Sequence, residues 1–560
     1  MKNKKASKQN NTTNNNTKIL FVVFISLVVF GICSFFVSLK QNFHFDELGS
    51  YALANNQFQV MIADYKVYSG DEVLKDYLTV HEGHQFDFAN LVDNQIHDTH
   101  PPLWYCMLHI ICSIFVGTFS KWYGLIINCI FMIFVYWFMR HLLLIVIKDK
   151  TASTIIPLLC LFSNAFINAI VFTRMYIVLE TISLAFMCLL IDKMLMLRNN
   201  EIESLPSYNN NIINSIIKEK FYILFVILTI VGTLTQYHYM VIAGLMSIVF
   251  GVFLLKRKEF KILIKSIISG IIGLVISYAI FPTMLTHIFG SSAGLHSLGN
   301  TKRDIDIMYN FIGFVISIRN AFFGNLSSFI VLFIILFIIV VICIVLSYKR
   351  KSVNHEIVKI EANDSIFVLL ILSFIAFVYY VVISLTATYV FSRYLYNIYP
   401  IISIVLFSIV FLLLYNINKN IKYLSLVFVL VSVICSNIKP PVHLYLERKD
   451  MLEFMKEHKD IKAVMTYYDN PQASILWKLP DALYDAKDLD EVVFVNIDRP
   501  NWEDNDVLKN NDNLFVFVYA DVMNHQQYDD EVISKISKNN NLENSMAIYK
   551  TSTIHLYMLY

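Results

Sequence analysis

The chain has 560 residues, of which 56% are hydrophobic and only 16% are charged. Soluble globular proteins carry about 45–50% apolar and about 25% charged residues, so this composition excludes a water-soluble or a disordered chain. Lysine and arginine number 45 against 43 acidic residues, and a net charge of +2 gives no support for a nucleic-acid-binding protein. We therefore expect a polytopic membrane protein.

The chain begins with residues 1–18, which are rich in Asn and Lys and have no apolar face, so we expect a disordered tail. The uncharged run 19–39 follows and is long enough to cross a bilayer core of about 30 Å. It is longer than the apolar segment of a cleaved signal peptide, which favours a retained anchor. Five lysines precede it, and this places the N-terminus in the cytoplasm and Lys40 outside.

Further apolar runs predict a mainly α-helical protein with about 11–13 transmembrane helices. The runs are 103–119, 122–147, 152–172, 175–196, 221–236, 238–255, 263–285, 328–347, 365–387, 393–416 and 423–438. The basic connections 193–220, 256–265, 349–359 and 419–422 then all face the cytoplasm. Between an outer His100 and an inner basic segment 140–150, however, the chain must cross the membrane an odd number of times, and only two apolar runs are present. Either three short spans or one span with a re-entrant piece would satisfy it.

Two polar segments, the loop 40–102 and about 287–327, are expected to lie outside next to the membrane. They belong to a transmembrane domain that we place at 19–438. Residues 439–560 instead alternate short β-branched or aromatic runs with helical stretches, which predicts a small C-terminal extracytoplasmic α/β domain. The predicted strands are 462–468, 491–497, 513–520, 546–550 and 553–559, and the predicted helices are 472–478 and 529–537.

The adjacent carboxylates Asp46 and Glu47 lie just beyond the first span, in the segment FHFDELGSY. A carboxylate in a partly dry site has a raised pKa, which suits a general base. Taken alone, the pair is more typical of a solvated helix end at the membrane surface, where acidic residues are common.

A second polar cluster precedes the next apolar run in NQIHDTHPPLWYCMLH, residues 94–109. The two prolines stop any helix before them, and Trp104 and Tyr105 are typical of the membrane interface. An aromatic belt explains these two rings but not why His97, Asp98 and His100 cluster there. Such a cluster can orient a phosphate or bind a divalent metal, and metal use stays open.

Three later motifs fall on the same outer side: Arg174 with Tyr176, His238 with Tyr239, and Arg393 with Tyr394. Each alone is typical of snorkelling or interfacial residues. Two outer arginines nevertheless run against the positive-inside bias, and arginine is a bidentate partner for phosphate. Together the motifs favour a reaction on an anionic, lipid-linked substrate.

The order of these motifs resembles the GT-C glycosyltransferases, in the bacterial branch of protein O-mannosyltransferases and aminoarabinose transferases (family 39-like). The resemblance covers roughly residues 19–440 and rests on Asp46–Glu47, His100–Pro101–Pro102–Leu103, Arg174–Met175–Tyr176, His238–Tyr239 and Arg393–Tyr394.

That resemblance implies an enzyme of the plasma membrane that moves a sugar, expected to be a hexose, from a polyprenyl phosphate to an extracytoplasmic acceptor. The acceptor is a protein, a glycolipid or a wall polymer. Asp46 is the implied base, with Glu47 beside it, and Arg174 and Arg393 are the implied cations for the leaving phosphate. Asp98, His100, Tyr176, His238, Tyr239 and Tyr394 are expected to bind substrate.

Two other classes remain. A flippase or transporter of lipid-linked sugars would carry ionisable residues at mid-bilayer, whereas the apolar runs here are nearly free of charge. A scaffold that displays the C-terminal domain would leave the motifs unexplained.

Overall fold

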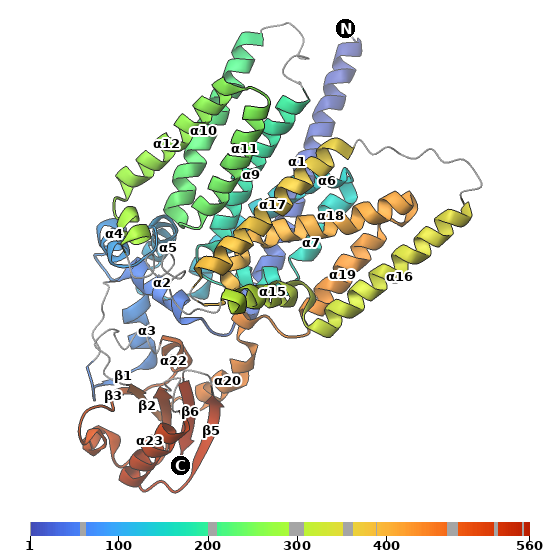
Figure 1. The fold of residues 1–560 in the computed structure, drawn as a ribbon. Coiled ribbons are helices and arrows are strands. Elements are labelled where there is room, and N and C mark those ends of the chain that lie inside the picture. Colours follow the sequence, from blue (N-terminus) through green and yellow to red (C-terminus); the bar gives the residue numbers. More distant parts are fainter. Residues whose placement is uncertain are drawn as a thin grey trace.

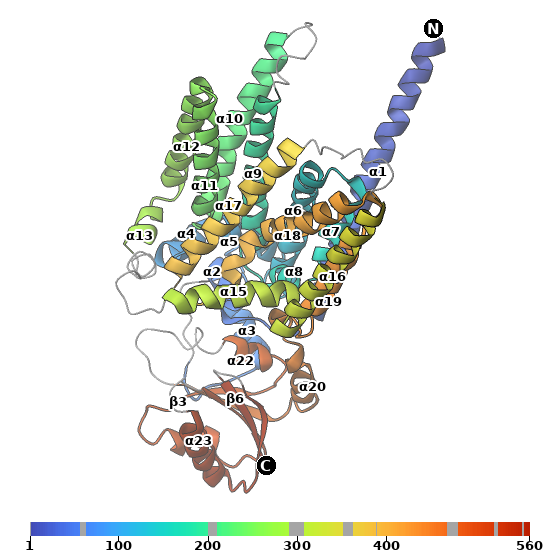
Figure 2. The same ribbon diagram turned by 45° about the vertical axis from the view of Figure 1, so that its right-hand side comes forward.

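A computed structural model describes residues 2–56, 63–199, 210–290, 307–350, 362–387, 389–467, 480–519, 525–550 and 554–560. Most of these residues are helical, and a six-stranded sheet is formed mainly by the C-terminal region. The N-terminal end of α1 and this sheet lie at opposite ends of the helical bundle (Figures 1 and 2).

The bundle is built from long apolar helices with several short helices at its sheet-facing end. In chain order they are α1 (Lys2–Leu39), α2 (Phe45–Asn55), α3 (Gly70–Leu78), α4 (Phe88–His97), α5 (Leu103–Ile114), α6 (Lys121–Ile147), α7 (Lys150–Cys160), α8 (Asn164–Val171), α9 (Tyr176–Arg198), α10 (Asn210–Thr235), α11 (Tyr239–Lys256), α12 (Phe260–Ile280), α13 (Met284–Phe289), α15 (Ile307–Phe323), α16 (Leu326–Arg350), α17 (Ala362–Thr386), α18 (Tyr399–Ile417) and α19 (Leu424–Ser436). A 3₁₀ helix, η2 (Ser392–Ile398), leads into α18.

Seven helices in the described residues are long and apolar enough to cross a bilayer, or up to nine if each bent pair is one span. The bent pairs are α7 with α8, at 61°, and α15 with α16, at 63°. These helices fit the expected multi-pass membrane protein, although 11–13 spans were expected. The difference arises because some apolar runs form short helices and because α9 carries Glu180, Asp192 and Lys193.

The helix lengths between residues 103 and 147 bear on the number of membrane crossings in that segment, which the sequence left open. Helix α5 has 12 residues, which is about 18 Å at about 1.5 Å per residue and too short for a bilayer core. Helix α6 has 27 residues and is long enough to cross. The helix lengths therefore fit one span with a short additional piece, rather than three spans.

Two segments differ from the expectation. Helix α1 begins at Lys2, so residues 2–18 continue the first helix instead of forming a disordered tail; the sequence there has no Pro or Gly to end it. The segment 287–327, expected to be polar and to lie outside, contains the 17-residue helix α15, whose sequence is mostly apolar. In both views α15 runs across the direction of most of the bundle (Figures 1 and 2).

The C-terminal strands are β2 (Lys462–Tyr467), β3 (Val492–Asn496), β4 (Leu514–Tyr519), β5 (Ser545–Lys550) and β6 (Ile554–Leu559). All five lie within the predicted runs, to within a residue at their ends, and the predicted helix 529–537 lies inside α23 (His525–Asn540). The predicted helix 472–478 is outside the described residues.

The sheet order is β1-β3-β2-β4-β6-β5, parallel among β3, β2 and β4 and antiparallel elsewhere. Alternate residues point to opposite faces. Val464, Val493 and Val516 pack in one apolar cluster with residues of α23. Ala463 and Met465 belong instead to the main apolar core that continues into the bundle. The edge strand β1 (Val67–Tyr68) comes from the loop 40–102, so this loop and the C-terminal region share one sheet.

Candidate functional site

The candidate site lies where the first turn of α2 meets the α8–α9 connection and η2. The sequence fixes α2 locally through a capping box. The His44 side chain accepts the Asp46 N–H at 3.1 Å, and the Glu47 carboxylate accepts the His44 N–H at 2.7 Å. Asp46 and Glu47 therefore both stand in the first turn, where the helix dipole favours negative charge.

Asp46 forms an ion pair with Arg393 from η2, with 2.8 Å between Oδ2 and Nη1. The two side chains are 19% and 12% exposed, so a ligand from outside can still reach them. Burial alone would raise the pKa of Asp46, but the charges of Arg174 and Arg393 outweigh it and lower this pKa. Asp46 is thus an ionised carboxylate facing two guanidinium groups.

Arg174 is buried and is held by several acceptors at once. Its Nη1 donates to the backbone oxygen of Asp46 and to Ser50 Oγ, each at 3.0 Å. Its Nη2 lies 2.9 Å from His100 Nε2. Because a guanidinium only donates, this nitrogen of His100 must accept and carries no proton.

The other ring nitrogen of His100, Nδ1, lies 2.8 Å from Asp98 Oδ2 and carries the proton. Burial alone would raise the pKa of Asp98, but its contacts with His100 and the Thr99 N–H lower it to about 2. Asp98 therefore fixes the tautomer of His100, and His100 fixes Arg174. His97, in contrast, is 59% exposed and contacts Asp93.

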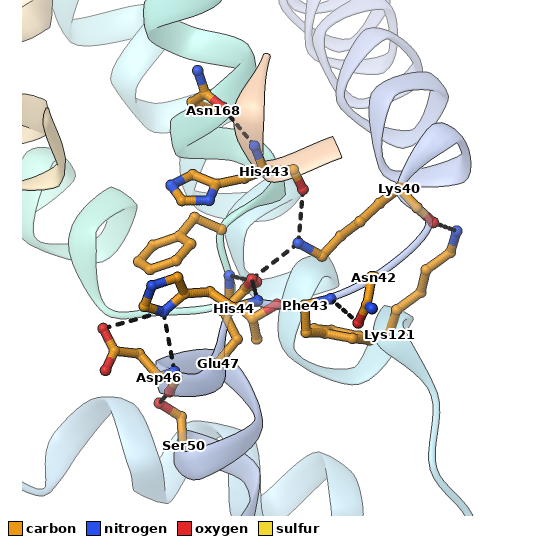
Figure 3. A network of polar contacts seen from close by, with 12 residues as sticks. Lys40, Asn42, Phe43, His44, Asp46, Glu47, Ser50, Lys121, Asn168 and His443 are labelled. Carbon is orange, nitrogen blue, oxygen red and sulfur yellow. Dashed lines mark hydrogen bonds and ion pairs between the residues drawn. The ribbon is translucent and has the colours of Figure 1, made fainter. Parts of the chain in front are cut away.

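Glu47 is fully buried and uses both carboxylate oxygens within the protein (Figure 3). Oε2 accepts Lys40 Nζ at 3.1 Å and the His44 N–H, and Oε1 accepts the Thr173 N–H at 2.7 Å. Such contacts are typical of a residue that holds two segments together. The catalytic part expected for Glu47 stays a prediction.

Three more of the expected residues line the same region. The Tyr176 ring lies 5.9 Å from Phe172 and 5.7 Å from Tyr396, between centroids. The His238 and Tyr394 rings are 6.1 Å apart. Burial lowers the pKa of His238 to about 4, so this imidazole is neutral.

Tyr239 lies apart from this group. Its ring packs 6.0 Å from Phe186, and a Cβ placed on Gly232 would lie only 2.5 Å from it. It is 1% exposed, and its hydroxyl has no hydrogen-bond partner among the described residues. Tyr239 is therefore a core residue between α9 and α10 in this structure.

Sequence reasoning missed His44, Phe172 and His443. The imidazoles of His44 and His443, both labelled in Figure 3, each contact the Phe172 ring. His443 stacks on Phe172 with centroids 4.3 Å apart, and His44 meets the same ring at 5.9 Å. Burial lowers the pKa of His44 to about 4; Asp46 opposes this shift, and the nearby cations add to it. His44 lies two residues before Asp46, within the segment FHFDELGSY, and could have been selected with it, whereas no nearby sequence pattern marks His443.

A divalent metal was left open by the sequence. In the part of the chain that the structure describes, no three His, Cys, Asp or Glu side chains are grouped so that they could hold a metal ion.

No protein-family model and no curated protein matches the sequence. Among solved structures, the chain is similar to ArnT from Cupriavidus metallidurans bound to undecaprenyl phosphate, with a TM-score of 0.47 and 10% identity over 97% of this chain and 98% of that one. The apo state of the same protein gives a TM-score of 0.45, also at 10% identity and with the same coverage. At this similarity the roles of individual residues rest on the contacts of this chain alone.

Proposed function

We propose that the chain is an integral-membrane glycosyltransferase of the GT-C type, in the branch of protein O-mannosyltransferases and aminoarabinose transferases. It moves a sugar, expected to be a hexose, from a polyprenyl phosphate to a hydroxyl acceptor outside the cytoplasm. The observation that carries the proposal is the 2.8 Å pair between Asp46 and Arg393, with Arg174 bound to the same turn of α2.

In the reaction the acceptor oxygen forms a bond to the anomeric carbon, and the bond from that carbon to the phosphate oxygen breaks. Asp46 takes the acceptor proton, and the polyprenyl phosphate leaves with the bonding electron pair. Charge builds up on the phosphate, so cations fixed beside it stabilise the transition state. Arg393 is the first candidate, because it is partly exposed and its planar fork suits phosphate.

A carboxylate paired with arginine is a weak base, so we expect the donor phosphate to bind before Asp46 accepts the proton. When the donor phosphate binds, it competes with Asp46 for Arg393. Loss of this partner raises the proton affinity of Asp46 at the moment when a proton must be accepted. Arg174 stays fixed by Ser50 and His100 throughout, and therefore acts as a stationary positive charge.

Charge and the arrangement of the bundle support the proposed sidedness. The lysine-rich end of α1 is placed in the cytoplasm by the positive-inside rule. Asp46 follows the opposite end of the same helix, and the sheet lies at that end too (Figure 1). Both observations support an extracytoplasmic position for the proposed catalytic group and for the C-terminal domain.

The test uses purified protein in proteoliposomes with a panel of polyprenyl-phosphate hexoses, and it follows free polyprenyl phosphate by mass spectrometry. We expect release with wild type and a loss of about 10²–10⁴-fold with Asp46→Asn, the usual contribution of a general base. Asp93→Asn, at an exposed carboxylate of α4, is the matched control and should keep full activity. Full activity of Asp46→Asn would remove Asp46 as the base, and movement of intact donor across the bilayer would favour a transporter.

A further inference from the structure

One buried lysine joins the first helix, the candidate site and the C-terminal region. The Lys40 side chain is fully buried, and its Nζ lies 3.1 Å from Glu47 Oε2 and 2.9 Å from the backbone oxygen of His443. The ammonium also lies over the rings of Phe43 and Tyr445, at 5.0 and 5.3 Å. A single cation therefore connects the end of α1, the start of α2 and the start of the C-terminal region (Figure 3).

The residues between Lys40 and the capping box are also held from the C-terminal side. The Gln41 N–H donates to the Leu444 oxygen at 2.9 Å, and Asn42 Nδ2 donates to Asp485. The Phe43 ring meets Tyr484 with centroids 5.0 Å apart. Asp485 and Tyr484 belong to α22 (Pro480–Asp485), which packs on the bundle side of the sheet.

These contacts make the position of the Asp46 turn depend on the C-terminal region. Burial lowers the pKa of Lys40, because the charged form loses its water, and Glu47 opposes this shift. A buried ammonium with fewer partners is costly, so the His443 oxygen helps to keep Lys40 in place. Lys40 in turn neutralises Glu47, and Glu47 caps the turn that presents Asp46.

We propose that docking of the C-terminal region onto the bundle fixes the position of the Asp46 carboxylate. Lys40 is the positioning residue that links the two. This inference rests on the function proposed above. We call Lys40 with its partners Glu47 and the His443 oxygen the Lys40 junction. The C-terminal region then acts on the rate of transfer without touching the substrate.

The experiment compares full-length wild type with Lys40→Met and Asp485→Asn in lipid nanodiscs. The first change removes the cation of the Lys40 junction, and the second weakens the same docking from the C-terminal side. Lys75→Met is the matched control, because Lys75 forms an exposed ion pair with Asp71. Amide hydrogen exchange is followed at Gln41, His44 and His443, whose N–H groups donate within these contacts or beside them.

We expect exchange at these amides to become at least about tenfold faster in both variants, since the local opening is no longer opposed. The kcat for donor turnover should fall by about 10–100-fold, and the donor KM should change far less, because a displaced base lowers the rate and not the binding. Lys75→Met should match wild type in all three readouts. If Lys40→Met does not fold, Asp485→Asn carries the test alone.

Unchanged exchange in both variants would overturn the Lys40 junction, and faster exchange with unchanged kcat would overturn its effect on Asp46. A failure of the proposed function looks different, because wild type then turns over no donor. In that case the exchange measurement still decides whether the C-terminal region holds the turn of Asp46.

Discussion

Arg393 Nη1 lies 2.8 Å from Asp46 Oδ2, although the two residues come from opposite ends of the transmembrane sequence. The pair brings the proposed base and the proposed phosphate ligand into direct contact. Each group therefore controls the other: the arginine keeps the carboxylate ionised, and the carboxylate fixes the arginine. Several consequences can be measured.

The first prediction concerns pH. Arg393 and Arg174 lower the pKa of Asp46, so Arg393→Met should raise it. Activity needs ionised Asp46 and is lost as the pH falls through this pKa, so the acid limb of kcat/KM should move to higher pH. The shift should be about one unit or more, as for an opposite charge within about 4–6 Å. Arg393→Lys, which keeps the charge, should shift the limb less.

The pH profile is measured from the residual polyprenyl phosphate release of each variant. Arg319→Met serves as the control, because the exposed Arg319 guanidinium donates to its sequence neighbour Asn320 and not to Asp46. An acid limb at the same pH in wild type and Arg393→Met would contradict the electrostatic role of Arg393.

The second prediction concerns the row Asp98, His100 and Arg174. Asp98→Ala removes the acceptor of the His100 Nδ1 proton, and His100 is then free to turn its other nitrogen into a donor against Arg174. We expect the donor KM to rise about tenfold, equivalent to about 1.4 kcal/mol. Asp98→Asn should keep most of the affinity, because its amide oxygen can still accept this proton. Steady-state kinetics with both variants distinguish a tautomer effect from a general loss of charge.

Much of this arrangement could be predicted from sequence. The β-strands of the C-terminal region were found because strand periodicity is a local property, as in Lys462–Tyr467. Asp46 and Arg393 could be singled out because they are charged residues beside apolar runs on the predicted outer side, where arginine runs against the positive-inside bias. Tyr239 was not separable from His238, since adjacent residues at a helix start are rotated by about 100° and face different neighbours.

The features that could not be predicted depend on contacts between residues far apart in the sequence. The burial of Glu47 depends on Lys40 and Thr173, and neither residue is marked as its partner by spacing or composition. The two-residue strand β1 is too short for any periodic signal, and only its pairing with β3 defines it. His443 could not be predicted for the same reason, because its contact with Phe172 joins segments that are far apart in the sequence.

The third prediction tests whether Glu47 stabilises the fold through its buried ion pair with Lys40. Glu47→Gln leaves Lys40 buried without a counter-charge, and breaking a buried pair costs about 3–5 kcal/mol of unfolding free energy. The double variant Lys40→Met/Glu47→Gln removes both charges and should recover part of that loss. Thermal unfolding midpoints in detergent measure the cycle. A double variant that is as unstable as the sum of both single variants would contradict the pairing.

The last prediction concerns how closely α6 approaches the Thr173 turn. A Cβ on Gly124 would lie 2.1 Å from Thr173 Cγ2 and 3.0 Å from the Tyr51 hydroxyl. Gly124→Ala should push Thr173 away, so that its N–H no longer reaches Glu47 Oε1. We expect a loss of about 1–3 kcal/mol, typical of overpacking, together with a lower kcat.

Thr173→Ser is the natural rescue, because it removes the methyl group that the new Cβ would strike but keeps the backbone N–H. Gly124→Ala/Thr173→Ser should therefore be more stable and more active than Gly124→Ala alone. Gly244→Ala is the matched control, since nothing lies within 4 Å of a Cβ at that glycine of α11. Unfolding midpoints and donor turnover are compared across the set. Equal losses in Gly124→Ala and Gly244→Ala would mean that helix packing at Thr173 does not support the turn of Asp46.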